Sequence, residues 1–375
     1  MALLVHSKDI QGVIADTVSI SKIPALTGQE GERAEWMALR LREMGWTAYR
    51  DLAGNVLAFW QEQPRHPLAV IAHLDTAAYP AGKPRIEKDG CTVTGPGVAD
   101  NGLGLAGLLA VARHFSDHCA PLLLACTVGG QDYSSIQGTN KVLEHERPLE
   151  LITIEGDGLH HLVNAGPGTM RLVLELHLKE GFSPPPRLSA LHSMIEILQQ
   201  IGDNTECESW NVQTLEGGEL TPSHSCQAQA QLEFRDHDAW HLIHAEKTVH
   251  AALEWLPGYL NGTLTRNGFC AGGSTDSQSP LIRDAIWARA ETGLKNELVS
   301  AHTDGLAAYA RNIPAVGVGL ARAEAMHTAY ESVDLNGLGS GLQALFELIE
   351  LRLAEISCRY SGQLAQKNDA ATPLS

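Results

Sequence analysis

Leu68-Ala-Val-Ile-Ala-His-Leu-Asp75 is the stretch that decides the fold, because an apolar run leads directly into a histidine and a carboxylate. Three similar apolar runs follow along the chain, at residues 122–126, 151–154 and 313–318. Short continuous apolar runs are typical of strands that are buried on both faces of a parallel sheet. Leu103 to Phe115, which lies between the first two runs, is predicted to be helical. Strand, helix and strand in this order predict an α/β domain.

The middle of the chain has a different pattern. Apolar and polar residues alternate over Met170–Leu178 and again over Cys226–Arg235. A period of two with one polar face predicts antiparallel strands, and their polar faces suggest an edge that is free for pairing. Apolar residues recur at helical spacing from Leu188 to Ile201 and again near Leu242 to Trp255. These patterns predict an α+β domain inserted into the α/β domain, with boundaries at 167–288 for the insertion and at 1–166 and 289–375 for the α/β domain.

Composition excludes several classes of protein. The 375 residues are 44% hydrophobic and 19% charged, which is ordinary for a folded chain and unlike a disordered one. The net charge is -17 and Lys and Arg do not cluster, so no nucleic-acid partner is expected. The longest apolar run, Gly102 to Ala112, is shorter than the roughly 20 residues of a membrane-spanning helix, and no secretory signal is evident. Scattered cysteines without a CxxC pair indicate reduced thiols and a cytoplasmic location.

Side chains that can bind a metal follow the predicted strands. Ligands of open α/β sheets bind beyond the carboxyl ends of the strands. The candidates at strand ends, before the helix and near the end of the chain are His73, Asp75, Asp100, Gln131, Asp132, Glu155 and His327. Each one alone is more often a solvated or capping residue, but imidazole and carboxylate together suit zinc or a similar divalent ion. Asp75 is expected to orient His73 by accepting its second N–H.

The order of these motifs resembles the M20 family of metallopeptidases and amidohydrolases, which includes aminoacylases, carboxypeptidases and deacetylases. His73-Leu-Asp75 is similar to the first His-x-Asp motif of the family, and Gly97-Val-Ala-Asp100 to the segment with the bridging aspartate. Ile154-Glu155 resembles the next carboxylate ligand. Ala301-His-Thr-Asp-Gly, residues 313–319 and Met326-His327-Thr-Ala-Tyr-Glu331 resemble the C-terminal segment with the last histidine ligand.

The resemblance implies a mixed, mostly parallel sheet with helices on both faces and an inserted domain that acts as a lid and dimerisation domain. It implies hydrolysis of an amide C–N bond in a small peptide-like or N-acyl amino acid substrate by a homodimer. One or two divalent ions are expected, with zinc first and manganese or cobalt as other choices. The ligands carried over from the family are His73, Asp100, Glu155 and His327, with a further ligand from a Glu-Glu pair.

The sequence departs from the family at that Glu-Glu pair, whose first member is the general base and whose second is a ligand. Aligned on Gly138, the pair falls on Gly130-Gln131, and a slip of one residue moves it to Gln131-Asp132, with Gln131 at the base position and Asp132 at the ligand position. Neither glycine nor glutamine accepts a proton from water, so Asp132 is the candidate base of this segment and Gln131 the candidate ligand. The family's lid histidine, which stabilises an oxyanion, is also absent from Lys179–Pro186.

Three functions therefore stay open at the level of the sequence. The first is a metal-dependent amide hydrolase with an atypical active site. The second is a non-hydrolytic homologue that binds a ligand or acts as a partner subunit. The third is an acyl-transfer or cyclisation enzyme, in which an attacking amine replaces the activated water.

Overall fold

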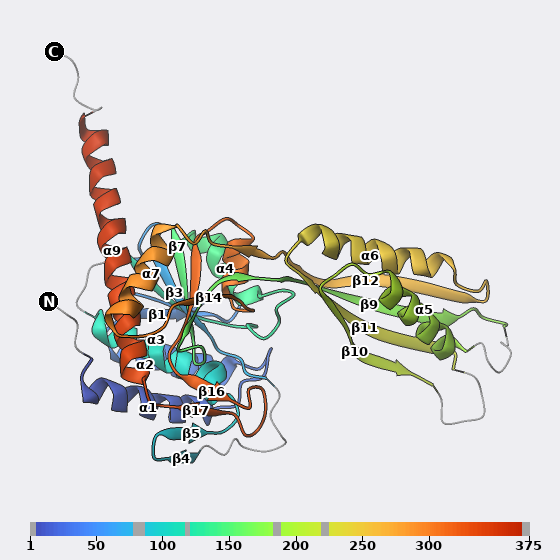
Figure 1. Ribbon diagram of the computed structural model, residues 1–375, viewed down its shortest axis with the longest axis horizontal. Helices are drawn as coiled ribbons and strands as arrows, with labels where there is room; N and C mark the ends of the chain where they lie inside the picture. Colours follow the sequence, from blue (N-terminus) through green and yellow to red (C-terminus); the bar gives the residue numbers. More distant parts are fainter. Residues whose placement is uncertain (1–4, 78–86, 117–120, 183–188, 219–224, 370–375) are drawn as a thin grey trace. The chain divides into compact units, whose positions relative to one another are not determined.

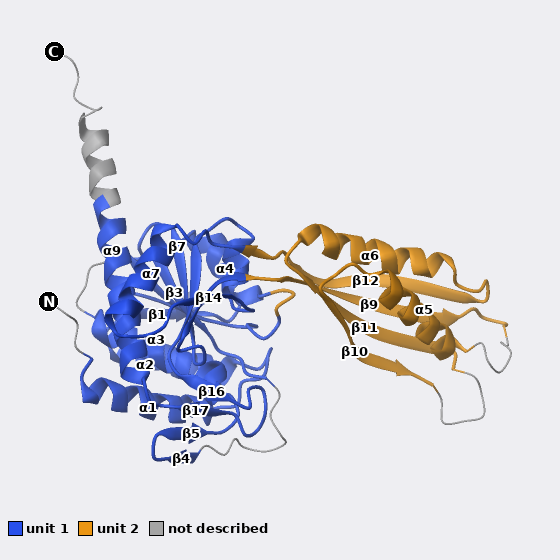
Figure 2. Cartoon of the chain, viewed as in Figure 1, with its two compact units in different colours: residues 1–132, 136–165, 274–375 blue, residues 133–135, 166–273 orange. Residues whose placement is uncertain are grey.

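The computed structural model describes residues 5–77, 87–116, 121–182, 189–218 and 225–369, and these form two compact units. Unit 1 comprises residues 1–132, 136–165 and 274–375, and unit 2 comprises residues 133–135 and 166–273 (Figure 2). The predicted insertion ends at residue 288, whereas residues 274–288 belong to unit 1 in the structure. The reason is that helix α7 (Pro280–Glu291) packs against α9 (Leu338–Asp369) of unit 1.

Unit 1 is built on a mixed sheet (Figure 1). Its strands lie in the order β1-β2-β6-β3-β7-β15-β8-β13, and β14 pairs with β8. The central pairs β3–β6, β3–β7 and β7–β15 are parallel. The bounds of the strands are β1 Thr47–Arg50, β2 Val56–Phe59, β3 Leu68–His73, β6 Leu122–Thr127, β7 Glu150–Glu155, β8 His161–Gly166, β13 Gly273–Ser274, β14 Glu297–Ser300 and β15 Ala315–Gly319. The predicted α/β class and mostly parallel sheet are confirmed.

Helices cover both faces of this sheet. Alternate residues of β3, such as Leu68 and Val70, belong to a core that includes side chains from α1, α2, α3, α7 and α9. The intervening Ala69 and Ile71 are buried outside that core, and α4 and α8 pack on each other and against β6, β7 and β15. Because successive strand residues point to opposite faces, α4 and α8 lie on the second face. The remaining helices are α1 Ser7–Ser21, α2 Gly31–Glu43, α3 Gly104–His114, α4 Gln137–Glu146 and α8 Gly305–Tyr309.

A smaller sheet holds the segment that precedes α3. Its strands lie in the order β16-β17-β5-β4, and every pair is antiparallel. The turn η1 (Val98–Leu103) follows β5, and the Gly95 N–H donates to the Glu331 carbonyl just before β17. This pairing brings the C-terminal segment beside η1. The bounds are β4 Glu87–Asp89, β5 Thr92–Thr94, β16 Arg322–Glu324 and β17 Ser332–Asp334.

Unit 2 is a four-stranded antiparallel sheet with two helices. The strand order is β10-β11-β9-β12, and Met170, Leu172, Leu174 and Leu176 of β9 are buried against α5 and α6. The predicted free edge on Met170–Leu178 and Cys226–Arg235 is wrong, because β9 and β11 pair with each other in the interior and the edges are β10 and β12. The bounds are β9 Gly168–Leu178, β10 Ser209–Gly217, β11 Gln227–Asp236, β12 Leu260–Cys270, α5 Ala190–Asn204 and α6 Ala239–Glu254.

A buried arginine fixes the segment that follows β3. Arg33 of α2 is fully buried and donates to the carbonyls of Ile23 and Leu74. Leu74 lies between His73 and Asp75, so this guanidinium anchors the chain at the end of the strand. In the part of the chain that the structure describes, no helix is both long and apolar enough to cross a membrane.

Candidate metal centre

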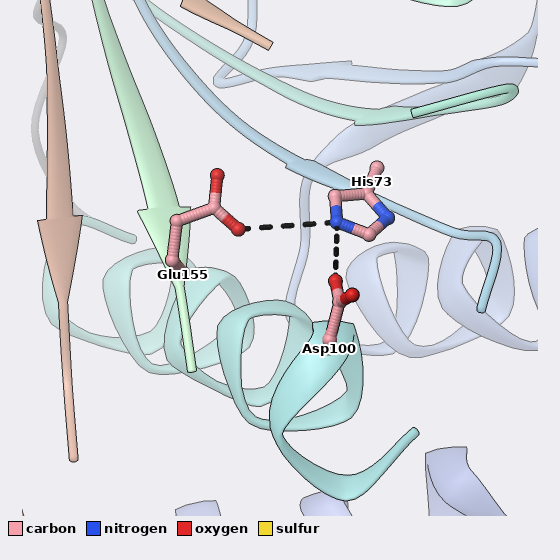
Figure 3. Close-up of side chains that lie close together, drawn as sticks. All are labelled: His73, Asp100 and Glu155. Carbon is pink, nitrogen blue, oxygen red and sulfur yellow. Dashed lines mark ion pairs between the residues drawn. The ribbon is translucent and has the colours of Figure 1, made fainter. Parts of the chain in front are cut away.

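Three side chains that can bind a metal converge at the carboxyl ends of the parallel strands. His73 is the last residue of β3, Glu155 is the last residue of β7, and Asp100 lies in η1. One ligand atom from each lies within 4.8 Å of the other two, and this is the one such group among the described residues (Figure 3). We call His73, Asp100 and Glu155 the three-ligand cluster.

The geometry of the three-ligand cluster suits one divalent ion. His73 Nε2 lies 2.9 Å from Asp100 Oδ1 and 3.8 Å from Glu155 Oε2. Ligands bound at roughly 2.0–2.2 Å from one zinc ion lie about 3–4 Å from each other, so the three atoms need little movement. His73 and Asp100 are buried and Glu155 is partly exposed. One nitrogen and two carboxylates match zinc, manganese or cobalt.

A second layer of contacts holds the His73 imidazole. Its Nδ1 lies 2.9 Å from the Asp75 backbone carbonyl and 3.4 Å from Asp75 Oδ1. The Asp75 carboxylate accepts from Thr27 Oγ1 and from the backbone N–H groups of Gly130 and Gln131. Asp75 therefore lies beside His73, but its carbonyl makes the shorter contact with the imidazole and its carboxylate anchors the loop at 130–131.

The charges of the cluster shift its pKa values in opposite directions. Burial alone would raise the pKa of Asp100, but hydrogen bonds with His327, His73 and Gln131 outweigh burial and hold it well below the usual range. Burial alone would lower the pKa of His73, but the carboxylates of Asp100 and Asp75 raise it well above its usual value. Burial raises the pKa of Glu155 to about 8. A metal that binds here therefore has to displace protons.

The other carboxylate oxygen of Asp100 faces a different pair of side chains. Its Oδ2 accepts from Gln131 Nε2 at 2.7 Å and lies 2.8 Å from His327 Nε2. The His327 side chain is half exposed, and its backbone has a φ of 62°, which is uncommon for a residue other than glycine. Glu331 supports Asp100 and His327, because its carboxylate accepts hydrogen bonds from the backbone N–H groups of Ala99, Asp100 and His327.

Gly130, one of the two positions predicted for the general base, lies in the loop after β6, directly against His73. A Cβ on Gly130 would lie 2.4 Å from His73 Cβ and 3.1 Å from Asp304 Oδ1, so no side chain fits there without a shift of its neighbours. Asp132 is partly exposed, and its backbone N–H donates to the Gly129 carbonyl. Its role as base stays a prediction.

Two carboxylates near the centre were not among the predicted site residues. Glu331 ends the Met326–Glu331 segment, and nothing in the pattern indicates that it binds the backbone of residues 99 and 100. Asp304 precedes the short helix α8 and would be taken for a cap, but its Oδ2 accepts from Thr127 and Thr139. Its Oδ1 is buried without a hydrogen-bond partner in the described structure. Both side chains are recognised only once distant segments are brought together.

Comparisons with known proteins agree with this geometry. The model of peptidase family M28 matches residues 55–127, which include His73 and Asp100. No curated protein matches the sequence. A tripeptidase from Staphylococcus aureus has a similar structure, with a TM-score of 0.73 and 19% identity over 91% of this chain and 98% of that one.

Two further solved structures extend the likeness. One is a Bacillus subtilis protein described as a dinuclear metal-binding peptidase of the M20 family, with a TM-score of 0.66 and 14% identity over 93% of this chain and 99% of that one. The other is an amidase of the hydantoinase/carbamoylase family from Burkholderia vietnamiensis, with a TM-score of 0.64 and 15% identity over 93% and 98% of the two chains. This protein therefore has the fold of M20 peptidases and of these amidases.

Proposed function

We propose that this protein is a metal-dependent hydrolase of amide C–N bonds in small peptide-like or N-acyl amino acid substrates. The observation that carries the proposal is the three-ligand cluster, whose ligand atoms lie within 4.8 Å of one another at the carboxyl ends of β3 and β7. The shared fold with a tripeptidase and an amidase supports it further. Zinc is the first choice of metal, since one imidazole and two carboxylates are ligands that it commonly takes.

Each residue of the centre has a role in this proposal. A bound divalent ion polarises a carbonyl and lowers the pKa of a water molecule. His73, Asp100 and Glu155 would hold that ion, and Asp75 keeps the imidazole in place through the contacts at its Nδ1. The hydrogen bonds that Glu331 accepts from residues 99 and 100 fix the position of the Asp100 backbone.

The general base is assigned to Asp132. Gly130 has no side chain and the Gln131 amide does not accept a proton from water, so Asp132 is the carboxylate that this loop offers. Its carboxylate would take a proton from the attacking water and return it to the leaving amine. General base catalysis typically contributes about 10²–10⁴-fold, so turnover is expected to depend on Asp132 to about that extent.

Hydrolysis is tested by supplying metal and following amine release. Protein freed of metal and reloaded with zinc or manganese is expected to release free amine from N-acyl amino acids or from di- and tripeptides, measured with an amine-reactive dye and by mass spectrometry. His73→Ala is expected to abolish release. Asp132→Asn is expected to lower kcat by about 10²–10⁴-fold, while the exposed Asp276→Asn serves as its matched control and leaves kcat unchanged.

Gly130 favours a second candidate, because no base can occupy its position. If the protein catalyses acyl transfer or cyclisation, mass spectrometry shows condensed or cyclic products without an increase in free amine. Substrate binding without any product, for the loaded protein and across the panel, would support a non-hydrolytic ligand-binding or partner-subunit role and contradict the proposed hydrolase.

We also propose a cytoplasmic homodimer. The edge strands β10 and β12 of unit 2 each have one side that is not paired in the sheet, and an edge of this kind can pair with a second copy. The scattered cysteines without a CxxC pair support a reducing compartment. Sedimentation equilibrium is expected to give twice the mass of one chain, and a monomer mass across micromolar concentrations would contradict the dimer.

A further inference from the structure

The two carboxylate oxygens of Asp100 lie in different surroundings. Oδ1 lies 2.9 Å from His73 Nε2, on the side of Glu155. Oδ2 lies 2.8 Å from His327 Nε2 and accepts from Gln131 Nε2 at 2.7 Å. A carboxylate with an imidazole at each oxygen has the arrangement of a bridge between two ions. Only the side of Oδ1, however, has the ligand atoms that an ion needs.

The second side is occupied by an amide where an anionic ligand would be needed. An ionised carboxylate oxygen accepts hydrogen bonds only, so the group of Gln131 that faces it has to be the NH₂ and not the carbonyl oxygen. An amide nitrogen offers two N–H donors and no ligand atom for a metal. The other possible ligand atoms on this side are Asp100 Oδ2 and the His327 imidazole, and among the described residues no further histidine, cysteine or carboxylate completes a group of three with them.

The charge of the ligands also argues against a second ion on the side of Asp100 Oδ2. Two metal ions in one site lie about 3.5–4 Å apart, so anionic ligands have to offset their repulsion. A glutamine has one negative charge fewer than a glutamate of nearly the same shape. In place of an ion, the Gln131 amide donates a hydrogen bond to Asp100 Oδ2, the oxygen that also lies 2.8 Å from His327 Nε2.

The backbone holds Gln131 in this position. The Gly130 and Gln131 N–H groups donate to the two oxygens of Asp75, at 2.8 Å and 2.9 Å. The loop also passes so close to His73 that a Cβ on Gly130 would be in collision with it. The start of the Gln131 side chain is therefore fixed relative to Asp100.

We infer that the centre binds a single metal ion, held by His73, Asp100 and Glu155, and that the Gln131 amide takes the place of a second ion. The inference rests on the proposed function, in that the three-ligand cluster has to bind a divalent metal. It sets this protein apart from the Bacillus subtilis relative, which is described as dinuclear.

The experiment is a metal count on the full chain after equilibrium dialysis against excess manganese and then metal-free buffer. The wild-type protein is expected to retain one ion per chain by elemental analysis, and His327→Ala is expected to retain one as well. Gln131→Glu is expected to retain two. Gln11→Glu, which adds the same charge at an exposed position of α1, is the matched control and is expected to retain one.

Electron paramagnetic resonance of bound Mn²⁺ gives a readout that does not depend on activity. The wild-type protein is expected to give the spectrum of an isolated ion, and Gln131→Glu the spectrum of a spin-coupled pair. Circular dichroism checks that each variant is folded.

Each other outcome overturns the inference in a distinguishable way. Two ions in the wild-type protein, reduced to one in His327→Ala, would overturn it and leave the proposed hydrolase intact. No ion in any variant would overturn both proposals. One ion in the wild-type protein and also in a folded Gln131→Glu would overturn the assignment of Gln131 as the group that excludes the second ion.

Discussion

Asp100→Asn is expected to remove metal binding and, with it, all hydrolytic activity. Asp100 is the central residue of the site: it contacts His73 through one oxygen and both His327 and Gln131 through the other. Asparagine keeps the shape but loses the charge, and its NH₂ group cannot accept the hydrogen bonds that one carboxylate oxygen now accepts. Changing a residue that only supports a ligand typically costs 10–100-fold in metal affinity, so loss of a ligand should cost more than about 100-fold.

Titration calorimetry with zinc or manganese measures this loss. Asp236→Asn is the matched control, since Asp236 is as deeply buried but lies in unit 2, where it accepts from the N–H groups of Glu208 and Asp238. That control is expected to lower the melting temperature without changing metal affinity. Wild-type affinity in a folded Asp100→Asn would contradict the ligand assignment.

Metal affinity is expected to rise steeply with pH between 6 and 8. The pKa of Glu155 is raised to about 8 by burial, and that of His73 lies well above its usual value because of Asp100 and Asp75. Glu155 therefore holds a proton below pH 8 and His73 holds one to a pH above its usual range, and a metal has to displace both protons. Each displaced proton gives about a tenfold rise in affinity per pH unit, so the rise over two units is about 10²–10⁴-fold. Asp100 adds nothing, because its low pKa keeps it ionised throughout.

The stability of the metal-free protein is expected to change with pH in the opposite direction to its metal affinity. A carboxyl whose pKa is raised on folding stabilises the fold at low pH, and this contribution is lost as the pH rises through the folded value near 8. The metal-free protein therefore loses stability where metal binding gains strength, and the difference in melting temperature between the two forms widens with pH.

Calorimetry in buffers of different ionisation enthalpy counts the protons released. Glu155→Gln removes one of them and is expected to give a shallower pH dependence, by one proton, together with weaker binding. An affinity that stays constant between pH 6 and 8 would show that the metal displaces no proton from His73 or Glu155.

The fold was predictable because burial on both faces leaves a simple mark in the sequence. The runs at 68–72, 122–126 and 151–154 became β3, β6 and β7, since strands in the interior of a parallel sheet carry apolar residues at every position. Strand order in unit 2 was not predictable, because β9 and β11 have the same alternation whether they lie at an edge or inside. The boundary at 288 failed for a similar reason: the apolar face of α7 does not reveal which unit it packs against.

Only the site residues that directly follow a buried strand could be predicted to lie together. His73 and Glu155 follow buried strands directly, so the parallel pairing of β3 with β7 was enough to bring them together. Glu331 and Asp304 act on groups from distant segments, namely the N–H groups of residues 99 and 100 and the hydroxyls of two threonines. Such contacts depend on the assembled structure and have no local pattern. The orientation of the Gln131 amide likewise depends on which oxygen of Asp100 it meets.

The position of β15 has a consequence for synthesis of the chain. This strand lies between β7 and β8, although residues 166–273 are made before it. The strands and helices of unit 2 can therefore form while β7 and β8 still lack the strand between them. Long-range pairing of this kind slows folding and exposes strand edges in the meantime. A chain that ends before residue 315 would contain all of unit 2 but would leave β7 without its neighbour β15, and this open edge is what a chaperone would have to cover.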